Sequence, residues 1–199
     1  MSVRGYEAPS ELTSAQRWGT YFCVLLTLGM IVMGFVLRGN ILNATRRFES
    51  PEVGIAVRYP ATWLIEQGTR PIIFRVTDPA AIPFKTTITV SVISRGATSS
   101  AEEVLRDLSL KRSSQIAPYK SLGIETIQLR NGTTARQQTY AYASVENNPF
   151  LQSEPIIVRA VDVIILRGSQ AVVITFETDG QSFERNQHYF EAFLASLEF

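Results

Sequence analysis

Residues 18–37, WGTYFCVLLTLGMIVMGFVL, form a run of twenty residues that contains no charge and lies between Arg17 and Arg38. About twenty apolar residues in a helix are enough to cross the ~30 Å hydrocarbon core of a bilayer. Trp18 and Tyr21 lie at one end of the run, and indole and phenol rings favour the headgroup level. A helix buried in a soluble domain normally has a polar stripe, which this run lacks. We therefore expect one membrane anchor, with Trp18, Tyr21 and Arg38 at its ends.

The main alternative for this run is a cleaved signal peptide. The apolar part of a signal peptide usually has ~7–15 residues and ends in a small-residue cleavage site. The run is longer than that, and the segment RGNILNATRR that follows offers no such site, so the pattern favours an uncleaved anchor. Gly29 and Gly34 lie five residues apart. They miss the four-residue spacing of close helix packing, but they still leave room for neighbouring helices.

The charges beside the run do not fix its orientation. Two arginines precede the run, offset by two glutamates, and three arginines follow it up to residue 47. A count of Lys and Arg therefore slightly favours the cytoplasm for the C-terminal side. Large domains, however, cross membranes largely regardless of charge.

The chain divides into four parts: a tail 1–17, the helix 18–37, a juxtamembrane linker 38–50 and one domain 51–199, which is long enough to bury its own core. Charged residues make up 19% of the chain, against a usual ~25%, in line with a membrane segment. The net charge of +1 gives no field that would attract nucleic acid. The single cysteine, Cys23, excludes an intrachain disulfide and a cysteine-based metal cluster.

Alternating and β-branched segments predict seven strands in the domain: 54–59, 72–77, 86–94, 124–130, 133–144, 156–167 and 170–178. The last two are the most apolar and are expected at the centre of the sheet. Amphipathic patterns predict helices at 99–115, where Ser100 and Glu103 have capping-box spacing, and at 181–197. Hairpins dominate this order, so we expect an α+β domain built on a mainly antiparallel sheet.

The stretch GIAVRYPATW, residues 54–63, shows how the first of these strands ends. Pro60 has no N–H and cannot continue a central ladder, and it keeps Tyr59 extended. Trp63 is well placed to return to the sheet edge as a large apolar plug. This Tyr-Pro…Trp pattern resembles the opening of the PsbP-like family, which also includes the Ran-binding Mog protein. The C-terminal segment 170–199, a strand followed by an aromatic helix, resembles the end of the same family.

The resemblance covers about residues 50–199 and implies an antiparallel sheet between helical layers, an α/β/α sandwich. Known family members are extrinsic subunits of photosystem II or assembly factors. The membrane anchor of this chain departs from them and puts a direct role in oxygen evolution in doubt. Family members with targeting signals lie outside the cytoplasm. The resemblance therefore implies a cytoplasmic N-terminus and a periplasmic, lumenal or cell-surface domain.

Residues suited to catalysis are scarce. His188 is the only histidine, so a zinc site or a Ser-His-Asp triad would have to be built on it, and a surface or interface position is favoured. Asp162 lies within a very apolar strand. We interpret it as a buried carboxylate satisfied by a hydroxyl or an arginine, with a functional polar site as the alternative. No catalytic, metal or cofactor residue is assigned, and we expect a protein that is not an enzyme.

The loop SVENNPFLQSEP, residues 144–155, contains Phe150 and Leu151 among polar residues. Exposed apolar residues can mark an interface, so both are candidate partner contacts, although both could equally be tucked under the domain. Two functions remain open. One is an accessory or assembly subunit of a membrane complex, photosynthetic or respiratory, which contacts other subunits and the bilayer. The other is a stand-alone envelope domain that binds a small molecule, lipid or peptide.

Overall fold

The computed structural model describes residues 14–42, 44–51, 53–96, 99–116, 118–145 and 154–199. The chain forms two compact units, Met1–Asn43 and Ala44–Phe199. In the first unit, helix α1 (Ser14–Leu42) carries the apolar run. The segment Arg17–Gly39 is long and apolar enough to cross a membrane, and its apolar side chains are exposed within the unit. It is the candidate membrane span of the described chain.

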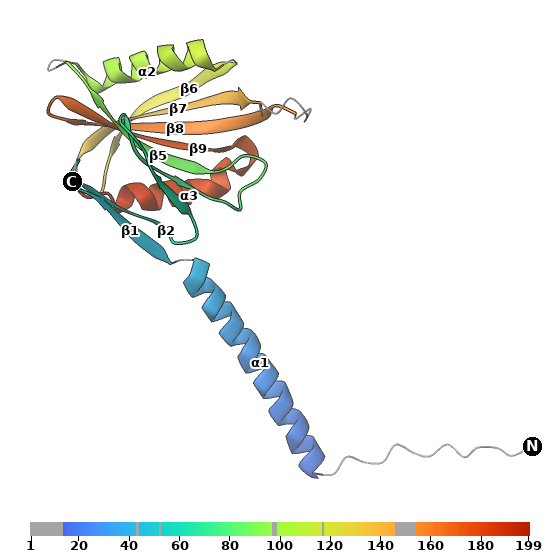
Figure 1. Cartoon of the computed structure of the whole chain (residues 1–199). Coiled ribbons are helices and arrows are strands. Elements are labelled where there is room, and N and C mark those ends of the chain that lie inside the picture. The colour runs from blue at the N-terminus through green and yellow to red at the C-terminus, as the bar shows by residue number, and fades with distance from the viewer. Residues whose placement is uncertain (1–13, 43, 52, 97–98, 117, 146–153) are drawn as a thin grey trace, which may run out of the picture. The chain divides into compact units, whose positions relative to one another are not determined.

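The second unit is the domain, and its elements follow in chain order (Figure 1). They are β1 (Thr45–Ser50), β2 (Ile55–Pro60), β3 (Leu64–Gln67), β4 (Ile72–Thr77), β5 (Thr87–Ser94), α2 (Ala101–Gln115), β6 (Tyr119–Gln128), β7 (Thr134–Ser144), β8 (Ile156–Arg167), β9 (Gln170–Asp179), the 3-10 turn η1 (Gly180–Ser182) and α3 (Phe183–Ala195).

A seven-stranded antiparallel sheet in the order β3-β4-β5-β9-β8-β7-β6 forms the middle layer. The expectation that the two most apolar strands lie centrally is confirmed, because β9 is the middle strand and β8 is its neighbour. Gly132 and Gly168 take positive φ values of 80° and 55° in the two tight hairpin turns. Left-handed backbone of this kind is readily adopted by glycine.

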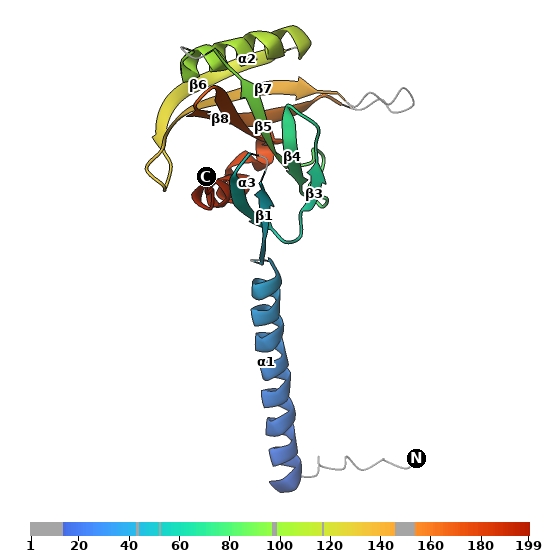
Figure 2. The same ribbon diagram turned by 60° about the vertical axis from the view of Figure 1, so that its left-hand side comes forward.

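Helices cover opposite faces of this sheet (Figures 1 and 2). On one face, α3 and the two-stranded β1–β2 ribbon enclose the larger core, which includes Phe74, Ile174 and Phe176. On the other face, α2 packs Val104 and Leu105 on β8 and β9. The expected α+β architecture, a mainly antiparallel sheet flanked by helices, is confirmed.

The capping box at the start of α2 is present. The side chain of Ser100 accepts a hydrogen bond from the backbone N–H of Glu103 at 3.2 Å, and the Glu103 carboxylate accepts one from the Ser100 N–H at 2.9 Å. Each contact satisfies a backbone donor that the first turn of a helix cannot pair internally.

The segment 38–50, expected as a linker, is structured instead. It contains the end of α1, which reaches Leu42, and strand β1, which pairs with β2 along its whole length. The sequence TRRFES gives no alternation signal because Phe48 is the only apolar residue on the face that meets the core, beside Arg46 and Ser50. Two other differences are the added short strand β3 and an earlier start of β6, at Tyr119.

Candidate docking site

The expected anchor residues all lie on α1. Trp18 is 76% exposed and Tyr21 64% exposed, and their rings meet edge to face with centroids 6.5 Å apart. Arg38 is exposed, and there is open space around Gly29 and Gly34. A helix with such a surface can meet lipid or other helices.

The Tyr-Pro…Trp motif lies in the core of the domain. Pro60 is the last residue of β2, and Tyr59 is 5% exposed. Trp63 is 4% exposed; its backbone N–H donates to the Pro60 carbonyl at 3.0 Å, and its ring packs against Tyr189 of α3 with centroids 5.4 Å apart. The motif therefore ties the end of β2 to α3 and is not available for binding.

Asp162 has the partners expected of a buried carboxylate. It is fully buried and forms a two-contact ion pair with Arg112 of α2, and the Thr175 hydroxyl donates to it at 2.7 Å. The interpretation of Asp162 as a carboxylate satisfied by an arginine and a hydroxyl is confirmed. Arg112 could not be assigned from the sequence, because it lies fifty residues away and on a helix.

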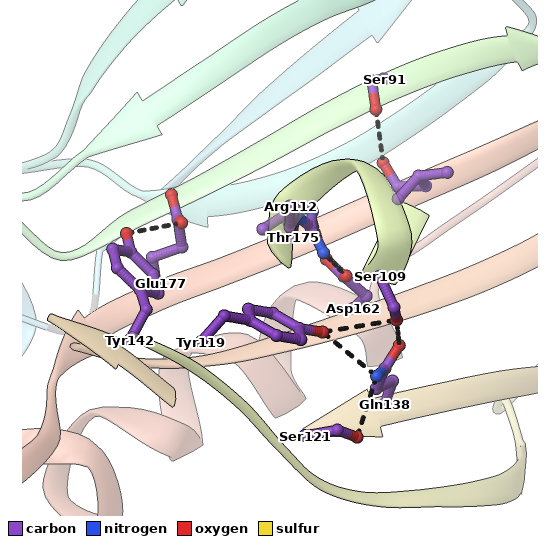
Figure 3. A network of polar contacts seen from close by, with 11 residues as sticks. Ser91, Ser109, Arg112, Tyr119, Ser121, Gln138, Tyr142, Asp162, Thr175 and Glu177 are labelled. Carbon is purple, nitrogen blue, oxygen red and sulfur yellow. Dashed lines mark hydrogen bonds and ion pairs between the residues drawn. The ribbon is translucent and has the colours of Figure 1, made fainter. Parts of the chain in front are cut away.

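A second polar cluster adjoins this ion pair (Figure 3). The Gln138 amide nitrogen donates to Ser121 at 3.0 Å and to Tyr119 at 3.3 Å, and its oxygen accepts from Ser109 of α2 at 2.8 Å. Nearby, Tyr142 donates to Glu177 at 2.9 Å. These contacts fasten the C-terminal half of α2 to the sheet, so we assign this network a structural role.

Burial changes the acidity of the tyrosines on this face. Desolvation raises the pKa of both Tyr140 and Tyr142 far above the usual range, with Glu177 adding to the rise and Arg112 opposing it. The Tyr140 hydroxyl is buried and has no hydrogen-bond partner in the described part of the chain. Both phenols therefore stay protonated in the folded domain.

The end of the β7–β8 hairpin at which residues 145–155 connect the two strands has the features of a docking surface. We define the hairpin-end strip as Ala141, Ala143, Val145 and Ile157. Ala143 lies directly opposite Ile157, and period-two alternation places Ala141 and Val145 on the same face. Val145 and Ile157 are each 57% exposed. The strip is an apolar surface in which Val145 and Ile157 are exposed and Ala141 and Ala143 are partly buried.

A groove of about 760 Å³ runs beside this strip; it is lined by Pro83, Ala141, Glu154, Pro155, Ile156, Ile157, Arg159, Asp179, Gly180 and Gln181. The Arg159 guanidinium lies 4.0 Å from the ring centre of Phe183 and pairs with Glu184 at 3.0 Å. Its buried Nε has no hydrogen-bond partner among the described residues. The groove therefore combines an apolar wall with a few polar groups, as binding surfaces commonly do.

The two predicted contact residues, Phe150 and Leu151, lie outside the described residues. They belong to the connection between β7 and β8, the same hairpin that carries the strip. Pattern reasoning missed both exposed residues of the strip. Val145 lies in the loop 144–155, where only Phe150 and Leu151 were singled out, and Ile157 reads as part of an ordinary apolar strand.

The residues with catalytic potential are dispersed. His188 is exposed on α3, where it contacts Tyr189 and the carbonyl of Arg185. Cys23 lies on α1. Within the described ranges, no group of three or more His, Cys, Asp or Glu side chains is placed to hold a metal ion.

Neither a comparison with models of protein families nor one with curated protein sequences gave a match. Solved structures are similar. Cyanobacterial PsbP (CyanoP) from Synechocystis has a TM-score of 0.57 and 9% identity, over 78% of this chain and 92% of that one. LpqN of Mycobacterium tuberculosis, described as involved in cell envelope biogenesis, has a TM-score of 0.53 and 12% identity, over 77% and 89%.

The Saccharomyces cerevisiae Ran-binding protein Mog1p has a TM-score of 0.49 and 12% identity, over 77% of this chain and 86% of that one. At such low sequence identities, structural similarity shows only that the fold is shared. The similarity to CyanoP and LpqN agrees with the resemblance that the Tyr-Pro…Trp motif carries in the sequence. The folded unit that follows α1 has a PsbP-like fold.

Proposed function

We propose that the protein is a non-catalytic, single-pass accessory or assembly subunit of a larger membrane protein complex. The observation that supports this proposal is the length and apolar character of α1. Its candidate span, Arg17–Gly39, has an exposed apolar surface, and the unit with the PsbP-like fold begins five residues after it, at Ala44. An anchored domain of this kind is suited to holding on to a complex at two points.

The first point is the span, which can pack against other helices in the bilayer. The second is the hairpin-end strip with its groove. Contact at one point raises the effective concentration of the other, so two weak contacts together give firm attachment. Isolated exposed apolar residues are common on protein surfaces; here they adjoin a groove, which favours a docking role.

The domain is proposed to lie outside the cytoplasm, with the N-terminus in the cytoplasm. The location of PsbP-like proteins with targeting signals supports this orientation. The same likeness, through CyanoP, suggests a complex of photosynthetic or respiratory electron transport. LpqN is the reason to keep a stand-alone envelope domain as the second candidate, with the groove beside Ile157 as its binding place.

The proposal that the protein binds and does not catalyse is supported by the side chains it contains. The chain has one histidine and one cysteine, which lie on different units. The strongly perturbed tyrosines have structural contacts: the Tyr140 ring lies 4.7 Å from the Arg112 guanidinium of α2, and Tyr142 donates to Glu177 of β9. Covalent or metal chemistry would need groups in closer association.

Copurification of the full chain in mild detergent tests the proposal. We expect a stoichiometric complex with other membrane subunits. The variant Val145→Ser/Ile157→Ser should weaken its retention in the complex, as should Phe150→Ala/Leu151→Ala. Leu110→Ser, at a leucine that is 63% exposed on α2, is the matched control and should be retained. A protein that runs alone under all conditions would remove the subunit proposal and favour the envelope-domain alternative.

A further inference from the structure

The β1–β2 ribbon carries an unusual arrangement of arginines. Arg47 on β1 lies directly opposite Arg58 on β2, and Arg46 lies opposite Tyr59. Phe48 and Val57 form the neighbouring pair and pack in the core, so alternation places Arg47 and Arg58 together on the outward face. Like charges directly opposite each other destabilise a strand pair. Arg46, opposite Tyr59, lies on the other face, the one that carries Phe48. We call Arg46, Arg47 and Arg58 the basic ribbon end, in which Arg47 and Arg58 share the outward face.

The acidic groups of the ribbon compensate only part of this charge. Arg47 pairs with Glu198 at 2.9 Å and, at 4.0 Å, with Glu49. Both glutamates lie toward the other end of the ribbon, since Ala56 pairs with each of them in the strand registers.

The other two arginines lack counter-charges. All three arginines of the basic ribbon end are exposed. Arg58 uses its backbone N–H and C=O to bond the Ser196 hydroxyl. In the part of the chain that the structure describes, the side chains of Arg46 and Arg58 make no hydrogen bond or ion pair. On the outward face, the guanidinium of Arg58 is therefore free to bind an anion from outside, beside the Arg47 guanidinium, which pairs with Glu198.

The covalent chain keeps this end of the ribbon near the end of α1. Leu42 is the last residue of α1, and Arg46 follows it by four residues. Four extended residues span at most about 14 Å. The field of an anionic bilayer surface reaches about one Debye length, ~8–10 Å at ordinary ionic strength. A basic group tethered this closely to a membrane span can meet lipid headgroups.

We propose that the basic ribbon end binds the phosphate of an anionic phospholipid headgroup, in the leaflet on the domain's side of the membrane. Guanidinium groups bind phosphate oxygens with paired, charge-assisted hydrogen bonds. A headgroup phosphate between Arg47 and Arg58 adds negative charge next to Arg58, which has no acidic partner in the described chain, whereas Arg47 pairs with Glu198. The inference rests on the membrane anchoring in the proposed function, and it adds the lipid class and the residues that recognise it.

The test uses the full chain in nanodiscs of phosphatidylcholine with a minor share of phosphatidylglycerol. After extraction into mild detergent, mass spectrometry measures the two lipids that remain bound. We expect phosphatidylglycerol to be enriched over its share in the nanodisc. The variant Arg47→Gln/Arg58→Gln should lose enrichment by about fivefold for each arginine, since a basic residue near an anionic surface has about that effect.

Arg106→Gln/Arg130→Gln is the matched control, because it removes the same charge at two exposed arginines elsewhere in the domain. It should keep the enrichment. Equal loss in both double variants, or no enrichment in the wild type, would overturn the inference. Displacement of phosphatidylglycerol by inorganic phosphate at similar concentration would assign the site to free phosphate instead of a headgroup and would also overturn it.

The same preparation separates this inference from the proposed function. A chain that fails to enter nanodiscs at all contradicts the membrane anchoring. A chain that enters them and shows no preference between the two lipids contradicts the headgroup site alone.

Discussion

Trp63 fills the space between the end of β2 and helix α3. Because it is large and buried, we expect it to contribute strongly to the stability of the domain. We predict that Trp63→Ala lowers the free energy of unfolding by about 3–5 kcal/mol, because truncating a large buried aromatic side chain removes its contacts and leaves a cavity. Chemical denaturation of a soluble fragment, residues 44–199, measures the change. Leu64→Ala, at the next residue, is the control; Leu64 is 58% exposed, and the effect should stay within about 0.5 kcal/mol. An unchanged midpoint for Trp63→Ala would mean that the indole is exposed and available to a partner.

Tyr140 makes the stability of the domain depend on alkaline pH. Its pKa in the folded state is raised, chiefly by burial, whereas in the unfolded chain a tyrosine has a pKa of about 10. Below that pH both states hold the proton, and the contribution of Tyr140 is fully present. Above it the unfolded chain releases a proton that the folded domain retains, so stability falls by about 1.4 kcal/mol per pH unit for this one residue.

Tyr140→Phe should remove this part of the alkaline loss, which denaturation curves between about pH 9 and 11 would measure, on either side of the free phenol pKa. Because the Tyr140 hydroxyl has no partner in the described chain, the substitution should cost little near neutral pH. Wild-type and variant curves that stay parallel through this pH range would contradict the prediction.

At the scale of elements, α2 is attached to the sheet by an apolar half and a polar half. Val104 and Leu105 are buried on the sheet, while Arg112 reaches the fully buried Asp162. Removing one member of a buried pair leaves the other as an uncompensated charge, which typically costs about 3–5 kcal/mol. Asp162→Ala should therefore destabilise the domain by that amount.

A double-mutant cycle distinguishes loss of the pair from loss of packing. Replacing both partners, Arg112→Met with Asp162→Leu, should be far less damaging than the sum of the two single changes, because buried ion pairs often do no better than apolar groups of similar volume. Urea denaturation of the four proteins gives the coupling energy. Strictly additive single effects would show that the ion pair is not coupled in solution.

The elements that could be predicted from the sequence are those whose pattern follows from burial. β8 and β9 are mostly apolar because both of their faces are largely covered, and the capping-box spacing marks the start of α2. β1 could not be predicted, since its sequence TRRFES has a single apolar residue, Phe48, and therefore no apolar–polar alternation. β3 has four residues, too few to show a period.

The site residues show the same difference between features that local sequence predicts and features that depend on distant segments. Asp162 was recognisable as an unusual carboxylate inside an apolar strand, because this depends on local sequence. The ion pair of Asp162 with Arg112 and the pairing of Ala143 with Ile157 could not be predicted, because each joins segments that are distant in the sequence. Register and helix docking arise from the whole sheet, which periodicity within one segment does not encode.

At the scale of the whole molecule, the chain combines an apolar helix with a domain. The domain has two separate surfaces, the hairpin-end strip and the basic ribbon end. The two surfaces suit different neighbours. The basic ribbon end begins four residues after α1 ends, which suits lipid, and the strip lies at the end of the β7–β8 hairpin, which suits a protein. The side of the membrane on which the domain lies decides which lipid leaflet and which protein subunits these two surfaces can reach.

We predict that the domain is extracytoplasmic. Two arguments compete: the arginines that follow the span favour the cytoplasm for this side, while the likeness to PsbP-like proteins favours the opposite. We give the likeness more weight, because charge bias orients short loops and has little effect on large translocated domains. Protease added to intact cells or spheroplasts should degrade the domain and leave a protected fragment that contains the N-terminal tail and α1. A cytoplasmic marker protein must survive the same treatment. A protected domain with an accessible N-terminus would reverse the topology, and the lipid leaflet and the partner subunits would then be those of the cytoplasmic face.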